Sequence, residues 1–468
     1  MTLSFPFKSL ISITIMMGLL PIGLMSCSED KEKNPIIYGG SSNADPLAAV
    51  QEAWDKIENE LDDRQAALVL MTTPGAPELN ATALQQAVDA TLPGTTKVWG
   101  LTSAYQVVFG TEPDATIGIF TPEGLLPSGV GFMALAYKDM KAGIGSMAPE
   151  SADVKILDTK ENGQTVIKAA IADAGMTEQD KPKVVFIVSC SSTPLFEILK
   201  GITEVVGSDV PVIGGRSAGI HSFLAGFQYE YQFTRSRASE DDLVVAVAYG
   251  DFKVASYWGY GHDEYPEKSG VLGNVVSTAN GARIGTIDDR PCAEVYAEWL
   301  DNNELITTAY ENAMAEDVNK GFGAEIWTRN AFKVSEGDTG AFITISATQT
   351  TPDGTCATCC STVEEGATAS LLSVTAAGAN GIFGKMIDQA RRSENMAKDD
   401  VAGAFLVACE SLLAGYPEFG SQVLGPIQSN IGADKPILGF LGSSEVGYTK
   451  EHGARHLSFS AAATVFSK

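Results

Sequence analysis

Three polar turns carry the side chains best suited to holding a small charged molecule. One contains Arg216, whose guanidinium presents a fork of N–H donors that fits a planar carboxylate. Backbone N–H groups and hydroxyls in such turns can also bind carboxylate or phosphate, whereas the competing interpretation is that their glycines only permit close packing. We weigh the two equally for Arg216 and Ser217 and favour packing in the other turns. The predicted ligand-binding residues are Thr102, Ser103, Gly214, Gly215, Arg216, Ser217, Ser443, Ser444 and Glu445.

Other reactive side chains give weaker signals. Cys190 or Ser217 could act as a nucleophile with His221 as its base, but no G-x-S-x-G turn surrounds the serine. Cys190 and Cys409 end apolar segments, which favours burial as small hydrophobic side chains. The four histidines form no ligand pair on one helix. We therefore predict no catalytic residue, no metal and no cofactor.

A cysteine cluster follows the turn signal Pro352-Asp353-Gly354. Cys356, Cys359 and Cys360 supply three thiols, fewer than the four ligands of a structural zinc site. Local disulfide bonding is favoured over metal binding, either between Cys356 and Cys360 or between one of the three and Cys292.

Two stretches of the chain recur in the same order. Lys97–Ala104 aligns with Pro211–Ala218 at an offset of 114 (211 − 97), and Ala134–Lys141 aligns with Ala246–Lys253 at an offset of 112 (246 − 134). Each copy has the pattern of a strand, a helix, a strand ending in a Gly/Ser turn, and a β-hairpin. The order and the near-constant offset indicate an internal duplication.

A third and looser copy closes the chain, at Ala404–Ala408, Ile437–Glu445 and His456–Phe466. The predicted fold is therefore α/β with mixed sheets. The N-terminal lobe duplicates the strand–helix–strand–hairpin unit, and the C-terminal lobe is a looser related unit. About 442 residues follow the first 26, which is too many for one compact core and suits two lobes.

The first residues have the pattern of a bacterial export signal. Residues 1–26 combine Lys8 with an apolar stretch, and Leu24-Met25-Ser26-Cys27 resembles a lipobox. We predict that Cys27 is lipidated and that residues 27–46 form the anchor and a charged tether. The alternative is an ordinary signal with a chance cysteine. The predicted location is the cell envelope, at the outer membrane, on its periplasmic face or the cell surface.

The net charge of the chain is −26, from 58 acidic and 32 basic residues. This excess of acid argues against a nucleic-acid partner and against binding to anionic lipid through basic patches. Because the acids are scattered rather than arranged as a calcium loop, we interpret them as a solubility feature.

Several motifs together resemble the FIST family. They are Gly214–Gly219, Gly281–Leu300, Val363–Ala367 and Pro436–Gly447. The resemblance implies a FIST N-terminal domain over residues 47–278 and a FIST C-terminal domain over residues 279–468. It also implies a sensory role, in which small ligands such as amino acids are bound and signalling modules respond. The family provides no established catalytic residues to carry over.

These inferences predict an envelope-anchored lipoprotein that senses or binds a small ligand, an amino acid or a similar carboxylate. Its expected partners are that ligand, a membrane reached through the lipid on Cys27, and a signalling protein. Two alternatives stay open: a cell-surface hydrolase or transferase, and a protein-interaction module without a small ligand.

Overall fold

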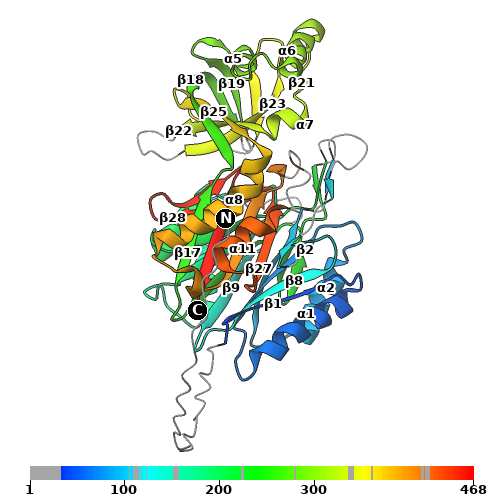
Figure 1. Ribbon diagram of the computed structural model, residues 1–468, viewed down its shortest axis with the longest axis vertical. Coiled ribbons are helices and arrows are strands. Elements are labelled where there is room, and N and C mark those ends of the chain that lie inside the picture. Colours follow the sequence, from blue (N-terminus) through cyan, green and yellow to red (C-terminus); the bar gives the residue numbers. More distant parts are fainter. Residues whose placement is uncertain are drawn as a thin grey trace, which may run out of the picture. The chain divides into compact units, whose positions relative to one another are not determined.

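The computed structural model describes residues 33–104, 106–108, 115–116, 119–122, 124–150, 156, 158–222, 226–278, 281–335, 342–359, 362–412, 416 and 422–468. Asn34–Lys468 forms one compact unit (Figure 1). The predicted signal peptide and Cys27 lie outside the described residues. Within the described part of the chain, no helix has the length and apolar character needed to cross a membrane.

Three six-stranded sheets share one plan. In each, two antiparallel strands precede a parallel pair, and a short hairpin completes the sheet. Sheet 1 has the order β1 (Ile36–Ser41), β8 (Val130–Leu135), β2 (Leu68–Pro74), β3 (Lys97–Ser103), β14 (Gln232–Thr234), β15 (Arg237–Ser239). Sheet 2 has the order β9 (Lys141–Met147), β16 (Leu243–Tyr249), β10 (Val184–Ser189), β11 (Val212–Arg216), β28 (Ser444–Thr449), β29 (Gly453–Leu457). Sheet 3 has the order β17 (Val254–Gly259), β30 (Ala461–Ser467), β26 (Val401–Cys409), β27 (Ile437–Gly442), β6 (Ile119–Thr121), β7 (Gly124–Leu126).

This common plan confirms the predicted duplication and the third, looser copy. The chain contains three repeats, each with a parallel strand pair of its own. The last hairpin of each sheet comes from a different repeat: repeat 2 completes sheet 1, repeat 3 completes sheet 2, and repeat 1 completes sheet 3. The three repeats are therefore joined by a cyclic exchange of hairpins, which the sequence pattern did not predict. Sheets 2 and 3 combine strands from both sides of residue 278, and the division into two FIST domains there stays a prediction.

A pair of helices accompanies the parallel strands of each repeat. The pairs are α1 (Pro46–Leu61) with α2 (Ala81–Thr91), α3 (Lys160–Asp173) with α4 (Phe196–Val206), and α8 (Ala376–Ser393) with α11 (Leu424–Ile431). Each pair buries its apolar face against one sheet in a separate core cluster. Asp158 caps the N-terminus of α4. Its carboxylate accepts hydrogen bonds from the backbone N–H groups of Phe196, Glu197 and Ile198, at 3.1, 2.9 and 2.9 Å.

The other faces of the three sheets share one central core. Trp99 of sheet 1, Phe186 of sheet 2 and Phe405 of sheet 3 are almost fully buried there. Their ring centroids lie 5.8 to 5.9 Å apart, so that the three rings form a triangle. This core fixes the three sheets against one another and brings the ends of their parallel strands together.

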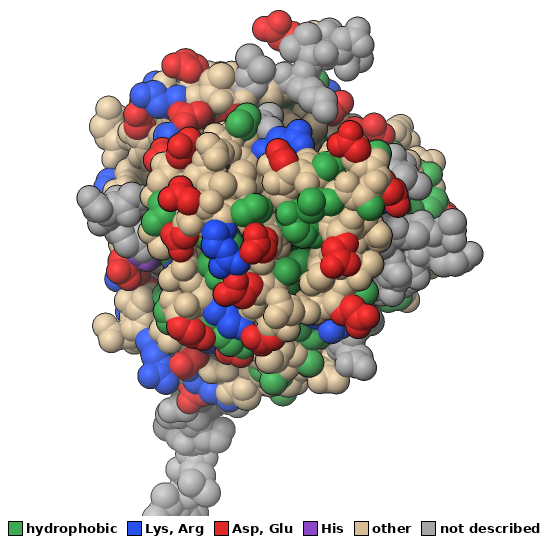
Figure 2. All heavy atoms as spheres, turned by 90° about the horizontal axis from the view of Figure 1, so that it is seen from above, with side chains coloured by type: hydrophobic (Ala, Val, Ile, Leu, Met, Phe, Trp, Pro, Cys, Tyr) green, Lys and Arg blue, Asp and Glu red, His purple; other side chains and the backbone are tan. Residues whose placement is uncertain are grey.

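An additional lobe is inserted into repeat 3, between β17 and α8. Its eight-stranded sheet contains β18 (His262–Thr278), β19 (Gly281–Ile287), β20 (Arg290–Pro291), β21 (Lys320–Gly321), β22 (Asn330–Ser335), β23 (Phe342–Thr350), β24 (Cys356–Cys359) and β25 (Thr368–Val374). The helices of the lobe are α5 (Cys292–Trp299), α6 (Glu304–Glu316) and α7 (Ala324–Trp327). The lobe has a hydrophobic core of its own. On the face seen in Figure 2, acidic, basic and apolar side chains are intermixed.

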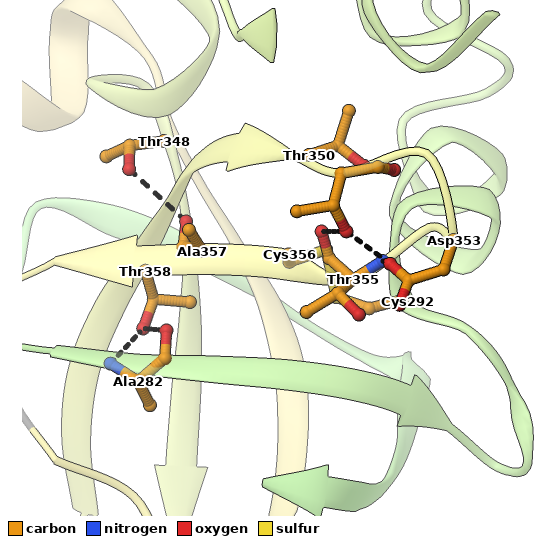
Figure 3. The surroundings of a disulfide bond; sticks show 10 residues. Ala282, Cys292, Thr348, Thr350, Asp353, Thr355, Cys356, Ala357 and Thr358 are labelled. Atoms are coloured by element: carbon orange, nitrogen blue, oxygen red, sulfur yellow. Dashed lines mark hydrogen bonds between the residues drawn. A yellow bond between two sulfur atoms is a disulfide. The ribbon is translucent and has the colours of Figure 1, made fainter. Parts of the chain in front are cut away.

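A disulfide bond joins a helix to a strand in the core of this lobe. Cys292, at the start of α5, is bonded to Cys356, at the start of β24 (Figure 3). This outcome confirms one of the two predicted pairings, the one that joins the cysteine cluster to Cys292. The side chain of Cys359 and the whole of Cys360 lie outside the described residues.

The remaining strands form a small sheet beside the strand ends of repeats 1 and 2. They are β4 (Gln106–Val108), β5 (Ala115–Thr116), β12 (Ile220–Ser222) and β13 (Gly226–Gln228). The pairing of β4 with β12 is parallel and joins the two repeats directly.

Candidate functional site

The three predicted turns meet at the ends of β3, β11 and β27. Their backbones are joined by three hydrogen bonds that form a closed ring. The bonds run from Ala218 N to Thr102 O (3.1 Å), from Ser443 N to Arg216 O (3.3 Å) and from Ala104 N to Leu441 O (2.8 Å). Each bond joins one repeat to another, because the three turns occupy equivalent positions. The structure therefore brings together segments that are more than 330 residues apart in the sequence.

Close backbone packing explains the two predicted glycines. At Gly214 the backbone has φ of +140°, and a Cβ atom would lie 1.9 Å from the Ile187 carbonyl oxygen. A Cβ at Gly215 would lie 2.3 Å from the Ser444 carbonyl oxygen. Both positions therefore require glycine for the contact between neighbouring strands, whatever ligand the site holds.

The hydroxyls of the first turn and of Ser217 join protein segments. Thr102 Oγ1 accepts a hydrogen bond from Tyr231 N at 2.9 Å, and Ser103 Oγ accepts one from Leu441 N at 2.9 Å. Ser217 Oγ donates to Ser189 O at 3.2 Å. All three side chains are fully buried. Their contribution to the fold is clear, and their role as ligand contacts stays a prediction.

Arg216 lies at the centre of the site and is almost completely buried. Its Nε donates to Ser444 Oγ at 2.7 Å, and its Nη1 donates to the Ser191 carbonyl oxygen at 2.7 Å. Its Nη2 makes a longer contact, 3.4 Å, with the Ser443 carbonyl oxygen. Among the described residues, one N–H on each terminal nitrogen remains without an acceptor. These remaining N–H groups are donors from which a carboxylate could accept hydrogen bonds.

His456 extends this contact through Ser444. Its Nε2 lies 2.7 Å from Ser444 Oγ. Because Arg216 Nε can only donate, Ser444 accepts from the arginine and donates its own proton to Nε2, which assigns the imidazole proton to Nδ1. Burial, followed by the charge of Arg216, holds the pKa of His456 well below its ordinary value. Nδ1–H is a fully buried donor with no hydrogen-bond partner in the described part of the chain.

A carboxylate is hydrogen-bonded to Ser191, which follows β10 and whose carbonyl oxygen accepts from Arg216. Half-buried Glu230 accepts hydrogen bonds from Ser191 Oγ at 2.6 Å and from Ser191 N at 3.0 Å. Burial raises the pKa of Glu230 to about 7, although the Ser191 hydrogen bonds and the Arg216 charge oppose the rise. Glu230 therefore changes its charge near neutral pH.

A second acid, Glu445, lies fully buried on the neighbouring strand. Its Oε2 accepts hydrogen bonds from Ser460 N at 3.2 Å and from Ser460 Oγ at 2.6 Å. Its Oε1 has no hydrogen-bond partner among the described residues. Burial raises the pKa of Glu445 to about 8, while hydrogen bonds from Ser460 and Cys409 and the charge of Arg216 oppose this rise. At neutral pH the side chain is therefore mainly a neutral carboxylic acid.

In each sheet, the parallel strand pair meets the exchanged hairpin along a line that we call the seam. Among the described residues, only the seam of sheet 2 carries ionisable side chains at the positions of Arg216 and His456. In sheet 2, the strand register places Arg216 beside Ser444, with His456 on the next strand. The position of the arginine is taken by Thr102 in sheet 1 and by Leu441 in sheet 3. The position of the histidine is taken by Ala238 and by Leu125. The common fold therefore does not require these charged side chains.

Some residues of the site were not predicted. Ser191 follows an apolar segment and Glu230 lies within an aromatic one, and His456 was predicted only as part of a strand of the third copy and weighed as a metal ligand. Alignment of the three repeats was the available signal, since it exposes the single seam with ionisable residues. Cys190 and Cys409 are buried, as predicted, and neither forms a disulfide bond with another described residue. The side chain of His221 lies outside the described residues, so its considered pairing with Cys190 or Ser217 is not tested.

No group of His, Cys, Asp and Glu side chains in the described part of the chain has the arrangement of a metal site. Arg216, Glu230, Glu445 and His456 are the ionisable side chains described near these strand ends. They comprise a permanent cation, two acids whose charge depends on pH, and a neutral imidazole donor.

Comparisons with known proteins identify a FIST N domain over residues 65–290. This match confirms the resemblance for that region, while the FIST C-terminal domain stays a prediction. No curated protein sequence is significantly similar to the chain. Among solved structures, a cyanuric acid hydrolase from A. caulinodans matches at 8% identity with a TM-score of 0.39, covering 92% of this chain and 98% of that chain. A second structure, described as "Cyanuric acid hydrolase: evolutionary innovation by structural concatenation", matches at 9% identity with a TM-score of 0.36 and the same coverage. At these TM-scores the likeness carries no argument about activity.

Proposed function

We propose that this chain, which contains a FIST N domain over residues 65–290, is a sensory or capture protein that binds an amino acid or a similar small carboxylate beside Arg216. The observation that carries the proposal is the single polar seam of sheet 2. There Arg216 and His456 are buried with N–H donors left over among the described residues, while the equivalent positions of the other two sheets hold Thr102 and Leu441 for the arginine and Ala238 and Leu125 for the histidine. A ligand would compensate the cost of burying these groups.

The chemistry of the cluster favours a carboxylate with a second, cationic group. The two remaining N–H groups of Arg216 suit the carboxylate. Glu230 lies within electrostatic reach of Arg216 and is only partly buried, so its carboxylate can pair with an ammonium group. A zwitterionic amino acid satisfies both requirements without adding net charge to a buried site.

A thermal-shift screen tests this function. The chain from Ser28 to Lys468, which includes the compact unit, is heated with amino acids, small carboxylates, nucleotides and divalent metals. A compound that binds only the folded state must raise the melting temperature in a saturable way. We expect the response to come from the amino-acid or carboxylate class.

Two arginine variants localise the response. Arg216→Gln removes the charge and the donor fork, so the shift produced by the active compound should disappear. Arg392→Gln is the matched control, because its side chain is 74% exposed on α8. A shift that persists in Arg216→Gln, or the absence of a response to every carboxylate, would contradict the proposal.

We also propose that the chain is exported and anchored in the envelope by a lipid on Cys27. The Cys292–Cys356 disulfide supports export, because such bonds persist mainly in oxidising compartments. Metabolic labelling with a palmitate analogue, followed by membrane fractionation, tests the anchor. Label should enter the wild type and be lost in Cys27→Ala; equal label in both would refute the anchor.

One observation keeps hydrolysis as the second candidate. Ser191 Oγ donates to Glu230 at 2.6 Å, which places a hydroxyl beside a carboxylate base whose pKa is raised to about 7. Turnover of a simple activated ester, such as p-nitrophenyl acetate, tests this function. Activity lost in Ser191→Ala would support a hydrolase, and equal background rates in both proteins would exclude this serine as the nucleophile.

A further inference from the structure

The three repeats provide an internal comparison for Glu445. The strand register pairs Glu445 with Gly215 and pairs Gln232 with Leu101, the equivalent residue of sheet 1. In sheet 3 the same place belongs to Ile119, since the next residue pairs with Gly439. All three side chains are almost completely buried. The fold thus accepts an isoleucine or an amide side chain at this position. It does not require the carboxylic acid of Glu445.

Gln232 shows which hydrogen bonds this position normally makes. Its Oε1 accepts from Asp242 N at 2.9 Å, and its Nε2 donates to Ser217 Oγ at 2.7 Å. In Glu445 the Oε2 atom takes the accepting role, because Ser460 N is the equivalent of Asp242 N. Glu445 Oε1 therefore occupies the place at which Gln232 presents a donor.

Gln232 donates to the hydroxyl of Ser217, and no hydroxyl lies at the equivalent place beside Glu445. The equivalent of Ser217 in repeat 3 is Gly442, which has no side chain. A Cβ atom at Gly442 would lie 2.6 Å from the Arg216 carbonyl oxygen, so the ring of turns leaves no room for a serine. Oε1 consequently has no hydrogen-bond partner among the described residues, although the side chain is fully buried.

The surroundings of Glu445 determine where a proton would lie. Oε2 already accepts two hydrogen bonds, from the backbone and the hydroxyl of Ser460. In the neutral acid, a proton on Oε2 would be donated to Ser460 Oγ, whereas a proton on Oε1 would be available for donation to a ligand. The other titratable or charged groups of the cluster are Arg216 on β11, Cys409 on β26, His456 on β29, and the acids Glu230 and Glu410.

We propose that protonated Glu445 is a specificity-determining residue, whose Oε1–H donates a hydrogen bond to an acceptor oxygen of a bound carboxylate. This inference rests on the proposed ligand-binding function and adds a requirement to it. The ligand must present a carboxylate or carbonyl oxygen to Oε1, and a group that only donates hydrogen bonds is excluded. Binding of the anion is coupled to retention of this proton, so affinity falls as the pH rises and Glu445 ionises.

Two substitutions of Glu445 test the contact, with acetate and L-alanine as probes and NMR titration as the measurement. Glu445→Ile installs the residue that repeat 1 carries at the same position, so folding is expected to persist. Because it removes a hydrogen bond to a charged group, the affinity for acetate should fall about tenfold or more. Glu445→Gln retains a donor, as Gln232 does, and acetate binding should persist.

The pH dependence separates the donor from a merely structural role. Both titrations are repeated from pH 6 to pH 9 in a Glu230→Gln background, which removes the other acid that titrates near neutrality. The affinity of the Glu445 protein for acetate should decline over this range, and that of Glu445→Gln should stay constant.

The outcomes distinguish this inference from the proposed function. Failure of both probes to bind the wild type would refute the proposed function, and the ligand contact with it. Equal binding of acetate to wild type and Glu445→Ile would refute the contact alone. Loss of acetate binding in folded Glu445→Ile, with binding retained in Glu445→Gln, would support it.

Discussion

Replacement of Glu445 by glutamine should change how the stability of the protein depends on pH. In the folded state, burial raises the pKa of this carboxyl from its ordinary value near 4.5 to about 8. The folded protein therefore keeps the proton over a pH range in which the unfolded chain releases it. By proton linkage, stability due to the neutral acid is fully present below pH 4.5 and is lost as the pH rises towards 8.

The size of the effect follows from the linkage relation. One bound proton changes the free energy of unfolding by about 1.4 kcal/mol per pH unit, which gives about 4 kcal/mol between pH 5 and pH 8. Glutamine fills the same volume, keeps the hydrogen bond from Ser460 N and does not titrate. Between pH 5 and pH 8, the free energy of unfolding of the wild type should therefore fall by about 4 kcal/mol relative to that of Glu445→Gln.

Urea denaturation at pH 5, 6, 7 and 8, followed by tryptophan fluorescence, measures the difference. Glu364→Gln is the control, because Glu364 is exposed on the inserted lobe and the substitution removes one acid without changing the core. A free-energy difference between wild type and Glu445→Gln that does not vary with pH would refute the neutral-acid assignment.

Three further changes test other parts of the structure. Cys292→Ser together with Cys356→Ser should lower the free energy of unfolding by about 2 to 4 kcal/mol, and calorimetry with and without reductant should show this loss; an unchanged melting temperature would contradict the bond. Asp158→Ala leaves three N–H groups at the start of α4 without their acceptor and should cost about 1 to 2 kcal/mol in urea denaturation; a loss near zero would mean that water replaces the cap. His262 is buried with neither ring nitrogen hydrogen-bonded within the described residues, and burial lowers its pKa to about 3. His262→Leu should therefore raise the free energy of unfolding by about 1 kcal/mol, and a decrease would indicate a polar partner.

Much of the architecture could be predicted from local sequence patterns. The offset between Lys97–Ala104 and Pro211–Ala218 identified two equivalent strands and turns, and the third copy appears as the matching sheet. The hairpin exchange could not be predicted, because an alternating apolar pattern specifies which face of a strand is buried but not which edge it joins. The lobe inserted after β17 also has no counterpart in the other repeats that could have revealed its boundaries.

The polar turns were located from the sequence, whereas their role in binding a ligand stays a prediction. Gly/Ser turns after strands are visible in the sequence, and they meet as the duplication implies. His456 lies on the hairpin that repeat 3 adds to sheet 2, and Glu230 lies in the segment between β13 and β14. Their spacing in the sequence therefore gives no indication that they lie near Arg216. Fully buried acids are also uncommon, so the sequence alone gives no indication that the predicted ligand residue Glu445 is completely buried.

The exchange of hairpins has a consequence for expressing parts of this protein. A fragment limited to residues 65–290 lacks β28 and β29, which cover the edge of β11, and it lacks β1, which covers the edge of β8. Both edges would present unpaired N–H and C=O groups to other copies of the fragment, which is a common origin of aggregation. We therefore expect the three repeats to fold together, and a fragment limited to the region recognised by the family signature to be less soluble than the whole compact unit.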